Sequence, residues 1–221
     1  MAIKAFIFDL DGVITDTVEY HFLSWKRVTD EEGIPFTREE NEHLRGLSRR
    51  EALNRILKGR PVDETVAQQW MTRKNDYYLA YVERFTSADR LPGVTETLET
   101  ARDAGLRLAV ASSSMNARLV LEKLDLLEMF AVVGDAYSVA NTKPAPDVFI
   151  WAAGGLNVSV AEAVVFEDAE AGVEAALAAG CWTVGLGNAG VQRAHRVYAG
   201  LHEVQVSEIL SQFATPQLTH E

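Results

Sequence analysis

Short apolar segments alternate with helical segments along the chain after Pro92 and Gly93. Each apolar segment is too short for a helix and ends in polar or acidic residues, which is typical of strands buried on both faces. Strands are expected at 3–8, 106–114, 130–135, 162–168 and 181–187, and helices at 94–105, 116–126, 146–156 and 171–180. This alternation predicts an α/β fold with a doubly wound parallel sheet.

The stretch between the first strand and Pro92 has helical features and no strand pattern. Apolar residues at helical spacing indicate helices at 17–32 and 62–84, and capping-box patterns at Thr37 and Ser48 indicate two more helix starts. We therefore expect a helical domain inserted after the first strand. The expected division is a core domain of residues 1–16 and 87–221 and an inserted domain of residues 17–86, with a frayed tail at 214–221.

The chain of 221 residues carries a net charge of −11. Such a surface repels the phosphates of nucleic acids and the head groups of anionic lipids, so neither nucleic acid nor membrane is expected as a partner. No apolar stretch approaches the roughly 18 residues that a membrane span needs, and the first residues do not resemble a signal peptide. Cys181 is the one cysteine, and its apolar setting predicts a core position. We expect a cytoplasmic monomer that acts on a small molecule.

Acidic and hydroxyl side chains follow several of the predicted strands. Asp9 and Asp11 follow the first strand, Ser112 ends the second, and Glu167 and Asp168 end the fourth. The carboxyl ends of parallel strands meet at one edge of the sheet, where ligands bind in such folds. These five residues are therefore expected to converge on one site.

The residue types at this edge suit phosphate chemistry. Asp9 and Asp11 point to the same side of an extended segment, Gly12 permits a sharp turn after them, and two close carboxyl groups push their pKa values apart. One can then act as nucleophile and the other as general acid or base. A carboxylate cluster also binds Mg²⁺, which prefers oxygen ligands.

Two residues outside the acidic cluster could contact a phosphate. Lys143 could balance the acids, and Asn116 begins a helix whose N-terminus favours anions. Each feature alone has an ordinary structural explanation, such as a turn-capping aspartate or a solvated lysine. Their occurrence in order after successive strands favours an active site.

The segments "DLDGVITDT", "VASSS", "KPAPDVF" and "FEDAEAG" together resemble the haloacid dehalogenase superfamily of phosphotransferases. The resemblance implies that Asp9 attacks phosphorus to form an aspartyl phosphate and that Asp11 is the general acid/base. It further implies that Ser112 and Lys143 hold the transferring phosphoryl group. The implied Mg²⁺ ligands are Asp9, the backbone carbonyl of Asp11, and Asp168, with Glu167 beside them.

The inserted region is similar to the mobile cap of one branch of this superfamily, through "DGVITDTVEYHFLSWK", "GLSRREALNRIL" and "RKNDYY". Members of that branch interconvert β-D-glucose 1-phosphate and glucose 6-phosphate through glucose 1,6-bisphosphate. The residues to which the resemblance assigns cap or hinge roles are Thr17 and His21 in the hinge, Lys74 on the sugar, and Arg49 and Asn116 on the non-transferring phosphate. Ala52, Ser113 and Met115 depart from the expected loop composition, although Ser113 is kept as a substrate-site candidate.

Without this resemblance, His21, Arg49 and Lys74 would be read as packing or solvated side chains. A sugar-phosphate phosphatase with the same Asp9 nucleophile is the main alternative function, because it differs only in letting water attack the aspartyl phosphate. A binding or regulatory protein that has lost catalysis is the alternative from another class. The presence of all four reacting-site residues, Asp9, Asp11, Lys143 and Asp168, argues against it.

Overall fold

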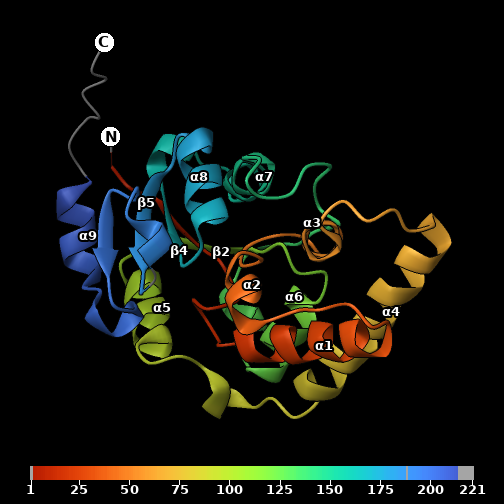
Figure 1. Cartoon of the computed structure of the whole chain (residues 1–221). Helices are drawn as coiled ribbons and strands as arrows, with labels where there is room; N and C mark the ends of the chain where they lie inside the picture. The colour runs from red at the N-terminus through yellow and green to blue at the C-terminus, as the bar shows by residue number, and fades with distance from the viewer. Residues whose placement is uncertain (1, 188, 214–221) are drawn as a thin grey trace.

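A computed structural model describes residues 2–187 and 189–213 of the chain. Within these residues, six parallel strands form one sheet in the order β3-β2-β1-β4-β5-β6 (Figure 1). Their bounds are β1 Ala5–Phe8, β2 Arg107–Ala111, β3 Val132–Gly134, β4 Ala163–Glu167, β5 Trp182–Leu186 and β6 Arg196–Tyr198. The order reverses at β1 and β4, which places a ligand-binding crevice beyond their carboxyl ends. The predicted α/β class and parallel sheet are confirmed.

Helices cover both faces of the sheet because β1 alternates its side chains between two apolar clusters. Phe6 and Phe8 join the cluster that contains α5, α6 and α9, whereas Ala5 and Ile7 join the cluster that contains α7 and α8. Every residue of β1 is buried, as expected for a central strand between two helical layers. The helix bounds are α5 Val94–Asp103, α6 Ala117–Lys123, α7 Asp147–Gly155, α8 Glu170–Ala179 and α9 Val206–Gln212.

The stretch between β1 and α5 contains four α-helices that share an apolar cluster of their own. They are α1 Val18–Glu31, α2 Arg38–Glu42, α3 Arg49–Leu57 and α4 Glu64–Val82. Figure 1 shows α1 and α4 side by side, away from the sheet. Both predicted capping boxes are present. The side chains of Thr37 and Ser48 each accept a hydrogen bond from the backbone N–H of the glutamate three residues later, and that glutamate's side chain accepts one from the backbone N–H of the capping residue.

Two elements near the C-terminus have no counterpart in the sequence-based prediction. They are the short strand β6 at the sheet edge and the helix α9. The predicted helix at 62–84 is shorter than expected and spans α4. The tail at 214–221 lies outside the described residues. Cys181 is buried as predicted, and within the described part of the chain no helix has the length and apolar character to cross a membrane.

Candidate active site

The ends of β1 and β4 bring the first acidic loop next to the second. Phe8 pairs with Phe166 in the parallel ladder, so Asp9 and Glu167 occupy neighbouring positions just beyond that pair. The Asp9 backbone N–H donates to the Phe166 carbonyl over 2.9 Å and continues the ladder by one bond. The predicted convergence of these acids is therefore a consequence of strand register.

Lys143 joins the two strand ends through its ammonium group. Its Nζ donates to Asp9 Oδ1 over 2.7 Å and also to Glu167 Oε1, and the side chain is fully buried. Burial alone lowers the pKa of Lys143, but the two carboxylates hold it above its ordinary value. Burial raises the pKa of Asp9, Lys143 opposes that rise, and Asp11 adds to it. A permanent positive charge thus lies against the proposed nucleophile.

Glu167 shapes the loop after β4. Its Oε2 accepts the backbone N–H groups of Asp168 over 3.0 Å and Ala169 over 3.1 Å, while Oε1 accepts from Lys143. A Cβ atom at Gly172 would lie 1.9 Å from Glu167 Oε1, so the first turn of α8 needs a glycine to leave room for this carboxylate. Burial raises the pKa of Glu167 to about 8.

The acidic residues at the two strand ends fit a divalent cation. Asp9, Glu167 and Asp168 are buried and offer carboxylate oxygens that lie within 4.8 Å of one another. Hard oxygen donors of this kind are the ligands that Mg²⁺ and Ca²⁺ prefer. The oxygens of Glu167 are already engaged by Lys143 and by backbone N–H groups, so Asp9 and Asp168 are the side chains with most capacity to coordinate an ion.

Asp168 also pairs with Arg45, a residue that the sequence reasoning missed. The Arg45 guanidinium reaches from the loop between α2 and α3 and donates through Nη2 to Asp168 Oδ2. Burial raises the pKa of Asp168 to about 7 in spite of this arginine. A Cβ atom at Gly12, whose φ is +86°, would lie 1.9 Å from the same Oδ2, so glycine is required there for space as well as for the predicted turn.

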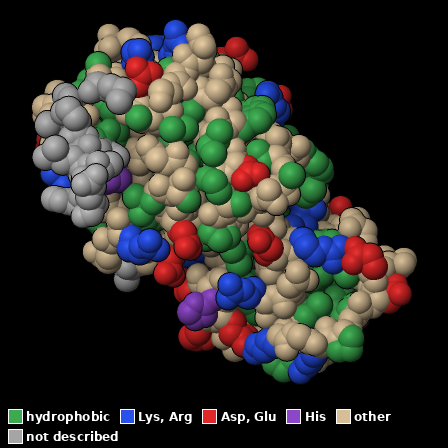
Figure 2. Space-filling model, turned by 90° about the horizontal axis from the view of Figure 1, so that it is seen from above, with side chains coloured by type: hydrophobic (Ala, Val, Ile, Leu, Met, Phe, Trp, Pro, Cys, Tyr) green, Lys and Arg blue, Asp and Glu red, His purple; other side chains and the backbone are tan. Residues whose placement is uncertain are grey.

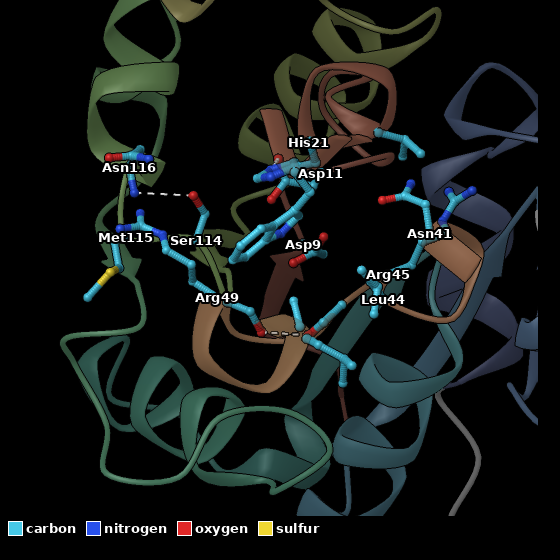
Figure 3. Close-up of a pocket in the computed structure, with 16 residues that line it drawn as sticks. Asp9, Asp11, His21, Asn41, Leu44, Arg45, Arg49, Ser114, Met115 and Asn116 are labelled. Carbon is cyan, nitrogen blue, oxygen red and sulfur yellow. Dashed lines mark hydrogen bonds and ion pairs between the residues drawn. The ribbon is translucent and has the colours of Figure 1, made fainter. Parts of the chain in front are cut away.

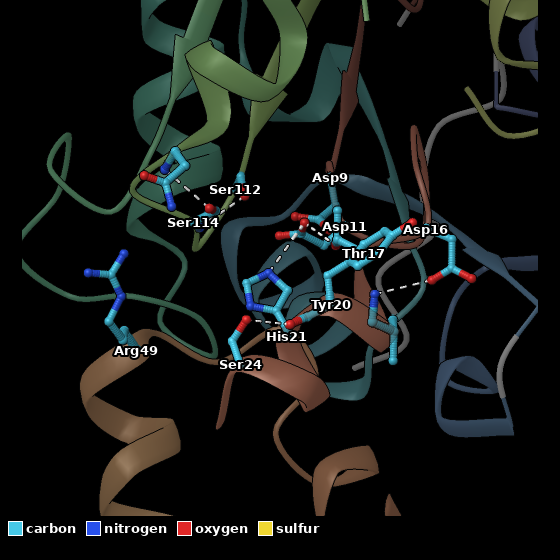
Figure 4. Close-up of polar contacts among 12 residues, drawn as sticks. Asp9, Asp11, Asp16, Thr17, Tyr20, His21, Ser24, Arg49, Ser112 and Ser114 are labelled. Atoms are coloured by element: carbon cyan, nitrogen blue, oxygen red, sulfur yellow. Dashed lines mark hydrogen bonds and ion pairs between the residues drawn. The ribbon is translucent and has the colours of Figure 1, made fainter. Parts of the chain in front are cut away.

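The Asp11 side chain is held by residues at the start of α1. Thr17 Oγ1 donates to Asp11 Oδ1, and His21 Nε2 lies 3.7 Å from the same oxygen (Figure 4). Burial favours a higher pKa for Asp11, but the bonds from His21 and Thr17 outweigh it and hold that pKa below its ordinary value. The pKa of Asp9 is raised chiefly by burial and that of Asp11 is lowered by His21 and Thr17, so the two values diverge.

Lys74 lies behind His21. Its Nζ is 2.6 Å from His21 Nδ1, and the imidazole stacks on Tyr78 with ring centroids 4.3 Å apart. Burial, reinforced by the charge of Arg49, lowers the pKa of Lys74 to about 7. Lys74 is only 3% exposed, is not a lining residue of the pocket above Asp9, and contacts His21.

A pocket between the inserted helices and the strand ends contains both aspartates of the first loop (Figure 3). Of the predicted site residues, those that line it are Asp9, Asp11, His21, Arg49, Ser113 and Asn116. The lining residues that the sequence reasoning did not assign to the site include Trp25, Asn41, Leu44, Arg45, Leu47 and Ser114. Ala52 and Met115, which depart from the expected composition, line it too. Thr17, Ser112, Lys143, Glu167 and Asp168 support this pocket from outside its lining.

Arg49 and Asn116 meet at the far end of the pocket from different parts of the chain. Both donate to the side-chain oxygen of Asn75, Arg49 Nη2 over 2.7 Å and Asn116 Nδ2 over 2.9 Å. Within the described residues no carboxylate lies within ion-pair distance of Arg49, although burial lowers the pKa of its guanidinium. A partly buried arginine that faces a pocket without a carboxylate partner suits an anionic ligand.

Three serines follow β2, and two of them, Ser113 and Ser114, line the pocket. Ser112 is buried, and its Oγ accepts the Ser114 backbone N–H over 3.0 Å. Ser113 Oγ donates to the Gly46 carbonyl over 2.8 Å and so contacts the loop that carries Arg45. This bond joins the segment after β2 to the loop between α2 and α3.

Several known proteins are similar to this chain. A family model described as haloacid dehalogenase-like hydrolase matches residues 6–186. A β-phosphoglucomutase from Bacillus subtilis (strain 168) is 44% identical over 188 residues, which cover 83% of this chain and 83% of the relative. A phosphorylated carbohydrates phosphatase from Thermotoga maritima is 31% identical over 179 residues, with coverage of 80% and 82%. The crystal structure of a β-phosphoglucomutase from Clostridium difficile superposes with a TM-score of 0.93 at 35% identity, with coverage of 96% of this chain and 97% of that one.

Proposed function

Because the chain belongs to the haloacid dehalogenase-like hydrolase family, we propose that it is a phosphoryl-transfer isomerase that interconverts β-D-glucose 1-phosphate and glucose 6-phosphate. The observation that carries this proposal is a pocket with an anion-binding group at each end. Asp9 with Lys143 lies at one end, and the guanidinium of Arg49, which has no carboxylate partner among the described residues, lies at the other. A sugar that carries a phosphate at one end and a hydroxyl at the other can span these two groups in either orientation.

The reaction consists of two transfers that use the same pair of aspartates. In the first, phosphorylated Asp9 gives its phosphoryl group to a sugar hydroxyl, the bond between the carboxylate and phosphorus breaks, and ionised Asp11 takes the hydroxyl proton. The resulting glucose 1,6-bisphosphate then reorients in the pocket. In the second transfer Asp9 attacks the other phosphorus, and Asp11 returns the proton to the departing sugar oxygen.

Lys143 and Ser112 assist the group that is transferred. The buried ammonium of Lys143 lies against Asp9, where it offsets negative charge on the phosphoryl oxygens, and the Ser112 hydroxyl is a further donor for them. We propose Mg²⁺ as the cofactor, held by Asp9, Asp168 and the backbone carbonyl of Asp11, with Glu167 beside it. When bound, this ion neutralises charge on the phosphoryl group and lowers the pKa of Asp9.

We propose that residues 17–86 act as a mobile cap on a core of residues 1–16 and 87–221. Thr17 and His21 lie at the hinge and hold Asp11, and Lys74, which contacts His21, is the cap residue proposed for the sugar. Arg49 from the cap and Asn116 from the core bind the phosphate that is not being transferred, so the pocket closes only when a sugar phosphate bridges the two parts. Closure protects the aspartyl phosphate from water.

The proposed partners are small sugar phosphates. On the face that Figure 2 shows, Lys and Arg side chains lie among Asp and Glu side chains and form no continuous basic surface of the kind that binds nucleic acid. A monomeric state and a cytoplasmic location stay predictions of the sequence.

A single assay tests the function. The protein is mixed with β-glucose 1-phosphate, Mg²⁺ and a trace of glucose 1,6-bisphosphate, and glucose 6-phosphate and free phosphate are both measured. We expect glucose 6-phosphate without matching release of phosphate, and no turnover by Asp9→Asn. Free phosphate as the main product would replace the isomerase with the phosphatase alternative, and turnover by Asp9→Asn would contradict the mechanism.

A further inference from the structure

Asn75, on α4, connects the two groups that are proposed to bind the non-transferring phosphate. Its Oδ1 accepts from Arg49 Nη2 over 2.7 Å and from Asn116 Nδ2 over 2.9 Å. Arg49 opens α3 in the inserted region, whereas Asn116 precedes α6 beside the sheet. One amide oxygen therefore fixes two donors that belong to different parts of the chain.

The pocket geometry shows that Asn75 acts from behind these donors. Arg49 and Asn116 line the pocket and Asn75 does not, so its oxygen does not occupy the space of a ligand (Figure 3). The bond from Asn116 uses one of two amide hydrogens, and the bond from Arg49 uses one of five guanidinium hydrogens. The remaining N–H groups of both residues are free to serve an anion in the pocket.

We propose that Asn75 is a positioning residue that holds Arg49 and Asn116 in register for the non-transferring phosphate of the substrate. The inference rests on the proposed function for the identity of the ligand. It adds that recognition of this phosphate depends on a neutral acceptor outside the pocket. A carboxylate in the same place would neutralise Arg49, whereas an amide oxygen orients the guanidinium and leaves its charge to the ligand.

A purely structural role for Asn75 makes a different prediction. If its bonds served only to tie the inserted region to the sheet side, loss of another such tie should have the same effect. Thr142 provides that comparison, because its Oγ1 donates to Glu51 Oε2 over 2.9 Å and so joins the same two parts of the chain without touching Arg49. Thr142→Val is therefore the matched control.

The experiment compares wild type, Asn75→Leu and Thr142→Val in the isomerase assay. Asn75→Leu removes the shared acceptor at similar volume, and we expect KM for β-glucose 1-phosphate to rise about tenfold with little change in kcat, as for loss of a bond to a charged group. Thr142→Val should keep KM within about twofold of wild type, the size of a weak neutral hydrogen bond. Acetyl phosphate has no second phosphate-sized group to reach Arg49, so its rate of phosphorylating Asp9 should be equal in all three proteins.

Several results would overturn the proposal. An unchanged KM in Asn75→Leu, an equal rise in Thr142→Val, or an equal loss with acetyl phosphate would each show that Asn75 does not act on the second phosphate. If wild type shows no isomerase turnover, the proposed function fails, and the same variants are compared by calorimetric titration with glucose 6-phosphate, where Asn75→Leu should still bind about tenfold more weakly. Asn75→Ser, which adds no apolar group, replaces Asn75→Leu if circular dichroism shows that the latter is unfolded.

Discussion

Lys74 gives a prediction about stability that follows from its burial. The side chain is 3% exposed, and burial lowers its pKa from 10.5 to about 7. Each pKa unit corresponds to about 1.4 kcal/mol, so the buried ammonium costs up to about 5 kcal/mol at low pH relative to a neutral amine. We expect Lys74→Met, which keeps the length of the side chain without its charge, to remove this cost.

The sign of the pH dependence follows from proton counting. Between pH 7 and 10.5 the unfolded chain keeps a proton on Lys74 that the folded chain has released, so the free energy of unfolding of wild type rises with pH in this window. Below pH 7 both states are protonated and the full cost is present. The advantage of Lys74→Met over wild type should therefore shrink by about 2.5 kcal/mol between pH 6 and pH 9.

Urea unfolding at several pH values, followed by tryptophan fluorescence, measures this difference. The other titrating groups are present in both proteins, so their contributions largely cancel in the comparison. Lys26→Met removes a lysine whose side chain is 38% exposed on α1 and controls for the general loss of one positive charge. A constant gap between Lys74→Met and wild type, or the same trend in Lys26→Met, would refute the reasoning about burial.

Three further outcomes test the site itself. Gly172→Ala places a Cβ atom 1.9 Å from Glu167 Oε1 and should destabilise the fold by about 1–3 kcal/mol in thermal unfolding, whereas Gly154→Ala, with nothing within 4 Å, should stabilise α7 by about 0.5–1 kcal/mol. Equal melting temperatures for these two variants would count against the packing of Glu167. Asp11→Asn should lower kcat about a hundredfold or more while Mn²⁺ binding by calorimetry persists, because its carboxyl group carries protons and its side chain is not in the ion-binding cluster. Mn²⁺ affinity of wild type should fall as pH drops below 7, since protons compete for Asp168, whose pKa burial raises to about 7; equal affinity at pH 6 and pH 8 would argue against Asp168 as a ligand.

The sequence predicts the fold well where burial is complete. The segment at β1 is an unbroken apolar run because both faces of the strand are covered, and the same holds for β4. β6 is not predicted from the sequence, because its three residues lie at the sheet edge and are largely exposed, so no apolar pattern marks them. Strand order is likewise invisible in the sequence, since it depends on which helices cover which face.

The residues of the candidate site also differ in how clearly the sequence marks them. Asp9 and Asp168 are recognisable because each directly follows a buried strand and the topology brings strand ends together. Arg45 and Asn75 carry no such mark, because their partners lie 123 and 41 residues away and are reached only when the inserted helices pack onto the sheet side. The contact between Lys74 and His21 also depends on packing, because the two residues lie 53 positions apart in the sequence.

The central claim is that an aspartyl phosphate forms on Asp9, and peptide mass spectrometry tests it most directly. Wild type and Asp9→Asn are each incubated with glucose 1,6-bisphosphate and Mg²⁺, quenched in acid and digested. We predict a mass increase of one phosphoryl group on the peptide that contains Asp9 in wild type, and none on that peptide in Asp9→Asn. A phosphoryl group on another residue of wild type, or unmodified peptides throughout a productive turnover, would contradict the account.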